Sequence, residues 1–392
     1  MISKKTTLFT ESVIRGMTQF CIRYNAINLS QGTPGLEPPD EVKQAAIDAI
    51  RDGYNQYSIT WGTPRFRQEI ARKLTEFNEI PTDPDRNVTV TCGSTESMMS
   101  AMLAIINPGD EVVIFEPFYE NYGPDVIISG AKPVYVPLRE TRTPAGNDVF
   151  TYDSNELQNA FSENTKAIIL NTPNNPLGKV FSREELQEIA ALCCEFDCLA
   201  VTDEIYEHMI YDGRPHVSVG ALPEMRDRTI TVSGLSKTYS MTGWRLGYVV
   251  APEYLTNAIR KMHDFLTVGA PHPLQEAGIV ALQLEAEYYQ RLVEQYDSKR
   301  KLLLEMLTQA GFRCYTPEGA YYIMTDISDF GFPNDTEFAH WLVRELGVGG
   351  VPGSSFYSCP ELGRTKLRFM FSKDEQTLRE AGERLMRVRE KI

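Results

Sequence analysis

The residues of this chain that are best suited to chemistry fall in short polar segments, each directly after an apolar run. These segments contain Gly93-Ser94-Thr95, Tyr119, Asn175, Asp203 with Tyr206, and Ser236-Lys237 with Arg245 eight residues further on. A glycine turn that opens a helix offers backbone N–H groups to a phosphate. A lysine amine can condense with an aldehyde. Each residue alone also fits an ordinary role as a helix cap, a turn residue or a packed ring. Only the occurrence of all of them together indicates a functional site.

As a set, these residues match the requirements of pyridoxal 5'-phosphate. Its aldehyde needs a lysine such as Lys237, and its ring nitrogen needs a carboxylate such as Asp203 to keep it protonated as an electron sink. Tyr119 would stack on the ring. No G-x-G-x-x-G follows an apolar run, and the spacing in Gly234–Lys237 is wrong for a P-loop. The residues therefore favour pyridoxal phosphate over a dinucleotide.

Strands that end at one edge of a sheet would bring these segments together. We predict strands, several of them apolar on both faces, at Asn87–Thr91, Glu111–Phe115, Pro133–Pro137, Ala167–Leu170, Leu199–Thr202, Thr229–Ser233 and Gly247–Ala251. Amphipathic helices are expected at Ser94–Ile106 and at Ser182–Cys194, which opens with a capping box. This alternation indicates an α/β fold with a mostly parallel sheet between helices. In such sheets ligands gather outside the carboxyl ends of the strands.

The pattern changes near residue 285. A long helix is expected from Glu285 to Gln309, another at Thr336–Leu346, a strand at Lys366–Phe371 and a last helix reaching Ile392. We therefore predict a large cofactor-binding domain over residues 41–285 and a small α+β domain over residues 286–392. Residues 1–40 would form an arm that packs with the small domain.

Composition narrows the class of protein and its partners. The 392 residues are 42% apolar and 23% charged, as in an ordinary globular protein, and the net charge is −14. Nucleic acid and anionic membrane are therefore unexpected partners. The seven cysteines, with one cluster at Cys193, Cys194 and Cys198, form no disulfide framework or metal motif. Because no secretory signal precedes them, the expected location is the cytoplasm.

Three motifs resemble those of the class I aminotransferases of fold type I, nearest the kynurenine, glutamine and methionine aminotransferase branch. They are NTPNNPLGKVFSREEL (Asn171–Leu186), DEIYEHMIYDG (Asp203–Gly213) and SKTYSMTGWRLGY (Ser236–Tyr248). The similarity runs from about Asn28 to Ser372, with further matches in NLSQGTPGLEPPD, NQYSITWG, EPFYENY, TDISDF and SFYS.

This resemblance implies roles for individual residues. Lys237 would bind the cofactor aldehyde and move the substrate proton, and Asp203 would pair with the ring nitrogen. Tyr206 and Asn175 would bond to the phenolic oxygen of the ring. Tyr119 would stack on the ring. The phosphate would be held by Ser94, Thr95 and Arg245.

The resemblance also implies a substrate site and a homodimer. Arg368, in KLRFMF, would bind the substrate α-carboxylate with the help of Asn175 and the backbone near Gly32. Tyr57 would reach the phosphate of the neighbouring subunit. Arg368 belongs to the predicted small domain and Lys237 to the large one, so substrate binding would close one over the other.

Three positions depart from the branch. Gly234 stands where many relatives have a phosphate-contacting serine, which leaves Ser233 and Ser236 as candidates for that contact. Ala270-Pro271 aligns with a Phe-His pair of the kynurenine enzymes, and Ile14 with a pocket aromatic. The expected activity is transfer of the amino group of a neutral or aromatic L-amino acid to a 2-oxo acid by a ping-pong mechanism. Cysteine-conjugate β-elimination and a dicarboxylate-specific aminotransferase remain as alternatives.

Overall fold

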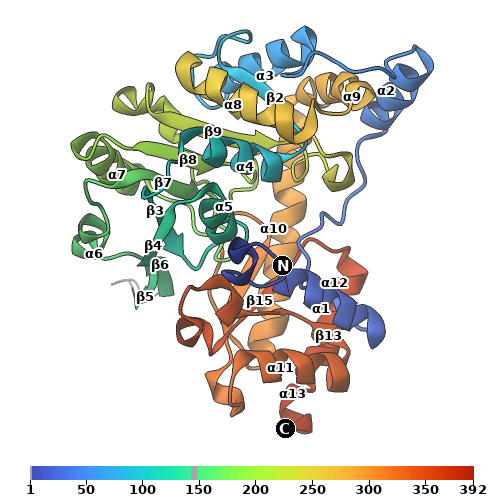
Figure 1. Ribbon diagram of the computed structural model, residues 1–392. Helices are drawn as coiled ribbons and strands as arrows, with labels where there is room; N and C mark the ends of the chain where they lie inside the picture. Colours follow the sequence, from blue (N-terminus) through green and yellow to red (C-terminus); the bar gives the residue numbers. More distant parts are fainter. Residues whose placement is uncertain (1, 143–147) are drawn as a thin grey trace.

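A computed structural model describes residues 2–142 and 148–392 and contains a central seven-stranded sheet (Figure 1). The strands, in spatial order, are β2 (Val88–Thr91), β10 (Gly247–Val250), β9 (Thr229–Gly234), β8 (Leu199–Asp203), β7 (Thr165–Asn171), β3 (Glu111–Glu116) and β4 (Lys132–Pro137). Every neighbouring pair from β9 to β4 is parallel, and only β10 runs antiparallel to both its neighbours. The predicted α/β fold with a mostly parallel sheet is confirmed.

Apolar side chains on both faces of this sheet explain why its strands are buried. Along β3, Val113 and Phe115 join a core with Leu186 and Ile189 of α7 (Arg183–Glu195). Between them, Val112 and Ile114 point to the opposite core, which contains residues of α4, α5 and α8. Alternate residues of a strand face opposite sides, so the apolar runs in the sequence correspond to helices on both faces.

Some helices of this part of the chain begin at a side-chain cap, which is Thr63 for α3 (Pro64–Glu76), Asp153 for α6 (Ser154–Asn159) and Ser182 for α7. At α7, the Ser182 hydroxyl accepts a hydrogen bond from the Glu185 N–H while the Glu185 carboxylate bonds back to the Ser182 N–H, as the capping box predicts. The other helices are α2 (Asp40–Arg51), α4 (Ser94–Ile105), α5 (Tyr122–Ser129), α8 (Glu253–Thr267) and α9 (His272–Leu282).

A second sheet lies with the C-terminal helices and the N-terminal segment. Its antiparallel strands are β11 (Arg313–Cys314), β12 (Tyr322–Asp326), β15 (Lys366–Met370) and β14 (Val351–Pro352). It packs with α10 (Ala286–Gln309), α11 (Asp335–Trp341), α12 (Glu375–Met386) and α13 (Val388–Lys391). The helix α1 (Val13–Arg23) adds Met17 and Cys21 to the same core. After α1, β1 (Ile27–Asn28) pairs in parallel with β13 (Val348–Gly349). The long helix α10 runs between the two sheets (Figure 1).

Two local features differ from the sequence prediction. The helix expected to end at Leu346 is α-helical only to Trp341, and Leu342–Leu346 continues as one π turn before Gly347 in the left-handed region. An antiparallel pair of β5 (Arg139–Arg142) and β6 (Asp148–Thr151) was not predicted, because β5 is polar and each strand has only four residues. Within the described ranges, every helix is too short or too polar to cross a lipid bilayer.

Candidate active site

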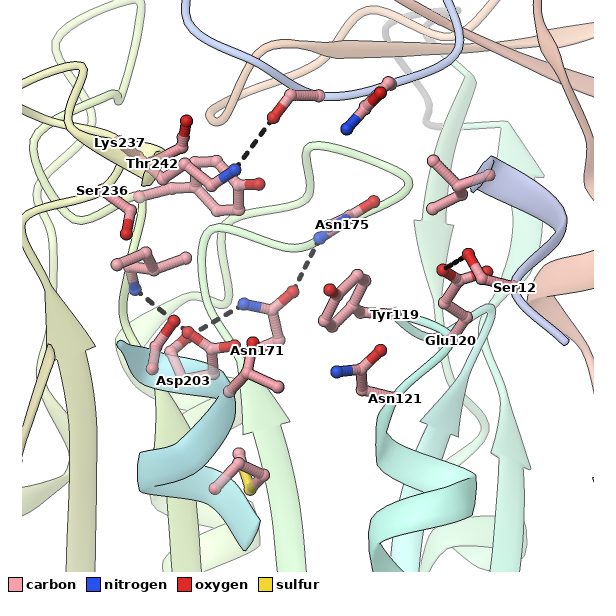
Figure 2. A pocket seen from close by; sticks show the side chains of 18 of the residues that line it. Ser12, Tyr119, Glu120, Asn121, Asn171, Asn175, Asp203, Ser236, Lys237 and Thr242 are labelled. Atoms are coloured by element: carbon pink, nitrogen blue, oxygen red, sulfur yellow. Dashed lines mark hydrogen bonds between the residues drawn. The ribbon is translucent and has the colours of Figure 1, made fainter. Parts of the chain in front are cut away.

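The predicted chemical residues converge on one cavity of about 410 Å³ at the carboxyl ends of the central strands. Figure 2 shows Lys237 and Asn175 on one side of it and Asp203, Asn171 and the ring of Tyr119 on the other. The predicted residues that line the cavity are Ile14, Gly32, Ser94, Thr95, Tyr119, Asn175, Asp203, Tyr206, Ser236, Lys237, Arg245 and Arg368.

Lys237 is positioned by the loop that follows β9. Its Nζ donates a hydrogen bond to the backbone oxygen of Gly32 at 2.9 Å, which joins this loop to the N-terminal segment (Figure 2). Burial lowers the pKa of Lys237 to about 8, although the nearby Asp203 acts in the opposite direction. A lysine in this environment has a substantial neutral fraction near neutral pH and can act as a nucleophile or base.

Asp203 is the last residue of β8 and is almost fully buried. Its carboxylate accepts the Tyr122 hydroxyl at 2.7 Å and the Ile205 N–H at 3.2 Å. Burial raises the pKa of Asp203 to about 6, and these two hydrogen bonds limit the increase because they stabilise the ionised form. At neutral pH this carboxylate is therefore charged and can pair with a cationic group in the cavity.

An anion site is formed where α4 begins. Gly93 precedes this helix with a φ of 86°, a conformation that favours glycine, and Ser94 and Thr95 form its first turn. A Cβ on Gly93 would stand 2.3 Å from the Arg245 guanidinium, so glycine is what lets this cation approach the helix N-terminus. Free N–H groups, two hydroxyls and a guanidinium are a donor set for a phosphate.

The glycine at position 234 also has a steric reason. It is the last residue of β9 and lies opposite Gly247 of β10. A Cβ at Gly234 would approach the Leu246 carbonyl oxygen to 2.8 Å and the Gly247 Cα to 2.9 Å. A serine therefore does not fit here with this backbone. Ser236 lines the cavity instead, and its buried hydroxyl has no partner among the described residues.

Arg368 enters the cavity from the second sheet, on β15, and its side chain is fully buried. One guanidinium nitrogen donates to Asn175 Oδ1 and another to the Ser30 backbone oxygen, both at 2.6 Å. The ring of Tyr322 lies 4.2 Å from the guanidinium carbon. The Nε has no partner within the described part of the chain. These contacts fix the orientation of the guanidinium within the cavity.

Tyrosine side chains surround the space between Lys237 and Arg368. The hydroxyl groups of Tyr206 and Tyr322 are 2.9 Å apart, and the Lys237 Nζ lies 6.0 Å from the centre of the Tyr206 ring. Tyr119 follows β3 and packs edge-on against Tyr122. Burial raises the pKa of Tyr119 and that of Tyr206 above the ordinary value, so both hydroxyls stay protonated at neutral pH.

Two predicted cofactor residues lie outside the cavity lining. Ser233 is buried in β9 and donates its hydroxyl to Glu207 at 2.9 Å, away from the predicted phosphate site. Tyr57 is 85% exposed and does not line the cavity in this single chain.

Several cavity residues were not predicted from the sequence. Tyr122 and Asn171 contact Asp203, and the Asn171 side-chain amide donates a hydrogen bond to the Asp203 backbone oxygen at 2.9 Å. Tyr122 does not stand at a strand end, so no sequence pattern gave a reason to select it. Asn171 is the last residue of β7, and a search for polar residues at strand ends could have found it. The Ser12 hydroxyl and the Glu120 carboxylate form a pair away from Asp203 in Figure 2, and Arg15 of α1, whose backbone N–H donates to the Ser12 hydroxyl at 3.2 Å, also lines the cavity.

Comparisons with known proteins agree with one another. The model of the family described as aminotransferase class I and II matches residues 24–385. The chain is 35% identical to human kynurenine–oxoglutarate transaminase 1, with 92% of each chain covered. It is 34% identical to the methionine aminotransferase of Escherichia coli, covering 98% of this chain and 96% of that protein. The solved N-succinyldiaminopimelate aminotransferase of Mycobacterium tuberculosis superimposes with a TM-score of 0.95 at 33% identity, covering 99% and 100%.

Proposed function

The chain belongs to the class I and II aminotransferases and is a transaminase that depends on pyridoxal 5'-phosphate; we propose that it transfers the α-amino group of a neutral or aromatic L-amino acid to a 2-oxo acid. The observation that carries this proposal is the convergence of Lys237, Asp203 and Arg368 from two different sheets on one cavity. The donor would leave as a 2-oxo acid before the acceptor binds, so the kinetics would be ping-pong.

The cavity fits pyridoxal phosphate at both ends. The space that Gly93 leaves beside Arg245, with Ser94 and Thr95, suits the phosphate. Asp203 would hold the proton on the ring nitrogen, and Tyr119 would stack on the ring. Tyr206 and Asn175 would bond to its phenolic oxygen. The unpartnered Ser236 hydroxyl supports a contact to the phosphate.

When bound, the cofactor supplies an electron sink that makes the Cα–H of the amino acid acidic. Lys237 would take this proton, because burial lowers the pKa of its amine to about 8 and leaves a fraction of it unprotonated at physiological pH. Arg368 would bind the α-carboxylate through two parallel hydrogen bonds, a geometry that lysine does not reproduce. Its contacts to Asn175 and Ser30 would hold the guanidinium in place before the substrate arrives.

Domain closure and a shared dimer site complete the proposal. Residues 41–285 would form the cofactor domain and residues 286–392, with the arm 1–40, the domain that closes over the substrate. Tyr57, Ile59 and Phe265 are exposed, the last by 92%, and a contact of 2.8 Å between His263 and the Thr60 backbone oxygen brings their two segments together, which supports burial of this face against a second copy. Tyr57 would then reach the phosphate of that copy. A cytoplasmic location is supported by the seven free cysteines.

The cavity wall supports a substrate with a neutral side chain, but it also contains Arg15, a cation that has no role in the cofactor and α-carboxylate contacts proposed above. Ile14 on α1 is buried and apolar, and it belongs to the apolar cluster against which Tyr119 packs. Kynurenine and methionine, the amino acids for which two of the relatives are named, also have uncharged side chains. However, Arg15 follows Ile14 on an exposed turn and lines the same cavity. This arginine favours a second candidate function, an aminotransferase for dicarboxylates, because it could bind a distal carboxylate.

A panel of half-reactions would test the two functions. Holoenzyme is mixed with each common L-amino acid without an oxo-acid acceptor, and the loss of the cofactor's visible absorbance is followed. Fast conversion by methionine, glutamine or aromatic donors and slow conversion by aspartate and glutamate supports the first function. The reverse order supports the second, and pyruvate with ammonia from a cysteine conjugate would indicate β-elimination. No conversion by any donor would refute both.

A further inference from the structure

Another buried carboxyl group, that of Asp125, lines the cavity close to Asp203. Asp125 lies on α5, one turn after Tyr122, whose hydroxyl bonds to Asp203. It is only 4% exposed, and its Oδ2 has no hydrogen-bond partner in residues 2–142 and 148–392. A buried polar atom without a partner is unfavourable unless something else occupies the space in front of it. Because Asp125 lines the cavity, a bound molecule can be that partner.

Other buried carboxyls near the site are paired, which makes Asp125 distinctive. Glu207 accepts from Lys73 at 2.5 Å and from the Asn78 amide at 2.8 Å. Glu204 accepts the Ser218 hydroxyl at 2.6 Å and faces a His216 nitrogen at 2.8 Å. These groups satisfy one another and do not need a ligand. The cavity carboxyl of Asp125 is left out of this network.

The surroundings of Asp203 and Asp125 decide which of them carries the negative charge. Asp203 accepts two hydrogen bonds and faces Lys237, all of which stabilise its ionised form. Burial and the negative charge of Asp203 both oppose ionisation of Asp125 and raise its pKa to about 8. Two neighbouring buried carboxyls whose environments differ in this way take different protonation states.

The other elements around α5 do not supply a cation that pairs with Asp125. Glu96 of α4 faces His263 at 2.9 Å instead. The ammonium of Lys5 bonds to the Ile128 backbone oxygen near the end of α5. On β4, the ammonium of Lys132 pairs with Glu111 of β3 at 2.9 Å. The remaining titratable groups on or beside this helix in the described ranges are Tyr119, Tyr122, Glu116 on β3 and Tyr135 on β4. None of these carries a positive charge.

We propose that Asp125 is a positioning residue of the ring-nitrogen end of the cofactor site, a carboxylic acid that is neutral in the apoenzyme at neutral pH and ionises more readily when a protonated ring nitrogen binds beside Asp203. The proposal rests on the role proposed above for Asp203. Asp125 would act on the ring through the charge of Asp203 and through a hydrogen bond from its own free oxygen into the cavity. No bond to carbon forms or breaks at this residue.

A measurable consequence follows from linkage. A protonated ring nitrogen close to Asp125 favours the ionised form, so cofactor binding lowers the pKa of this carboxyl. The wild-type affinity for pyridoxal phosphate should therefore increase with pH as Asp125 loses its proton. Asp125→Asn keeps the size and neutral charge of the protonated acid but cannot ionise. The variant should bind pyridoxal phosphate as tightly as the wild type does at low pH and more weakly than the wild type at high pH.

The test measures the dissociation constant of pyridoxal phosphate from wild-type apoenzyme and from Asp125→Asn between about pH 6.5 and 9.5. We expect the ratio of variant to wild type to be close to one at the acidic end and about tenfold at the alkaline end, for about one unit of pKa change. Glu120→Gln, which removes a cavity carboxylate already bonded to Ser12, serves as the matched control with a constant ratio. A ratio for Asp125→Asn that does not change with pH overturns the proposal.

A second measurement needs no variant. Infrared difference spectra of wild-type apoenzyme should contain the C=O stretch of a protonated carboxyl that disappears with a midpoint near pH 8. Absence of any such band also overturns the proposal. The role of Asp203 is tested separately with Asp203→Asn. Normal turnover in that variant would refute the proposed function, whereas a pH-independent ratio for Asp125→Asn with an inactive Asp203→Asn refutes only this inference.

Discussion

Replacing Arg368 by lysine should selectively remove recognition of the substrate α-carboxylate. The native guanidinium is fully buried and oriented by bonds of 2.6 Å to Asn175 and to the Ser30 oxygen. A lysine keeps the charge but cannot make these two bonds and a two-pronged contact to a carboxylate at the same time. Loss of one charge-assisted hydrogen bond is worth roughly 1.5–3 kcal/mol. This corresponds to a decrease of about 10- to 150-fold in kcat/KM.

The assay compares two donors that differ only in the carboxylate. Single-turnover rates are measured for L-phenylalanine and for phenethylamine with wild type and with Arg368→Lys. The variant should lose rate with the amino acid, while the slow rate with the amine should change little. Arg364→Lys, at an exposed arginine that bonds to Glu361, is the matched control and should behave as wild type. An unchanged preference for the amino acid in Arg368→Lys would refute the role of this arginine.

Three further predictions concern the cofactor. Gly93→Ala should weaken binding of pyridoxal phosphate about tenfold or more in an equilibrium titration, since the new Cβ would stand 2.3 Å from Arg245 at a φ of 86°; unchanged affinity would contradict the phosphate site. Tyr122→Phe removes the 2.7 Å bond that stabilises ionised Asp203, so the pKa of Asp203 should rise and kcat should fall several-fold; a pH–rate profile identical to that of wild type would contradict it. In apoenzyme, Lys237 has its pKa lowered to about 8 by burial, so its rate of covalent labelling should rise with pH up to about 8 and then level off; a rise that continues to 10.5 would contradict it.

The sequence predicted the parts of the site that follow from strand order. Asp203 ends the apolar strand β8 and Lys237 follows the end of β9 by three residues, and parallel strands that end at one edge bring such residues together. The Arg368 assignment needed family resemblance, because nothing in the local pattern of β15 says that its side chain faces Asn175. The same applies to Ile14, which reaches the cavity only through the packing of α1.

Other features depend on contacts between distant segments and could not be predicted. Tyr122 lies on a helix rather than at a strand end, and its bond to Asp203 depends on how α5 packs. Ser233 was expected near the phosphate, but its position in β9 directs it to Glu207. The absence of a serine at Gly234 looked like a missing phosphate contact, whereas the close approach of β10 leaves no room for a side chain there. The π turn after Trp341 likewise has no local sequence signal.

The central claim is that the amine of Lys237 is the group that binds the cofactor. The most direct measurement is borohydride reduction of the enzyme loaded with pyridoxal phosphate, followed by proteolysis and peptide mass spectrometry. The account predicts one stable pyridoxyl adduct, located on the peptide that contains Ser236-Lys237, and no such adduct in Lys237→Ala. Protein that stays colourless with the cofactor, or an adduct that maps to a different lysine, would contradict the account.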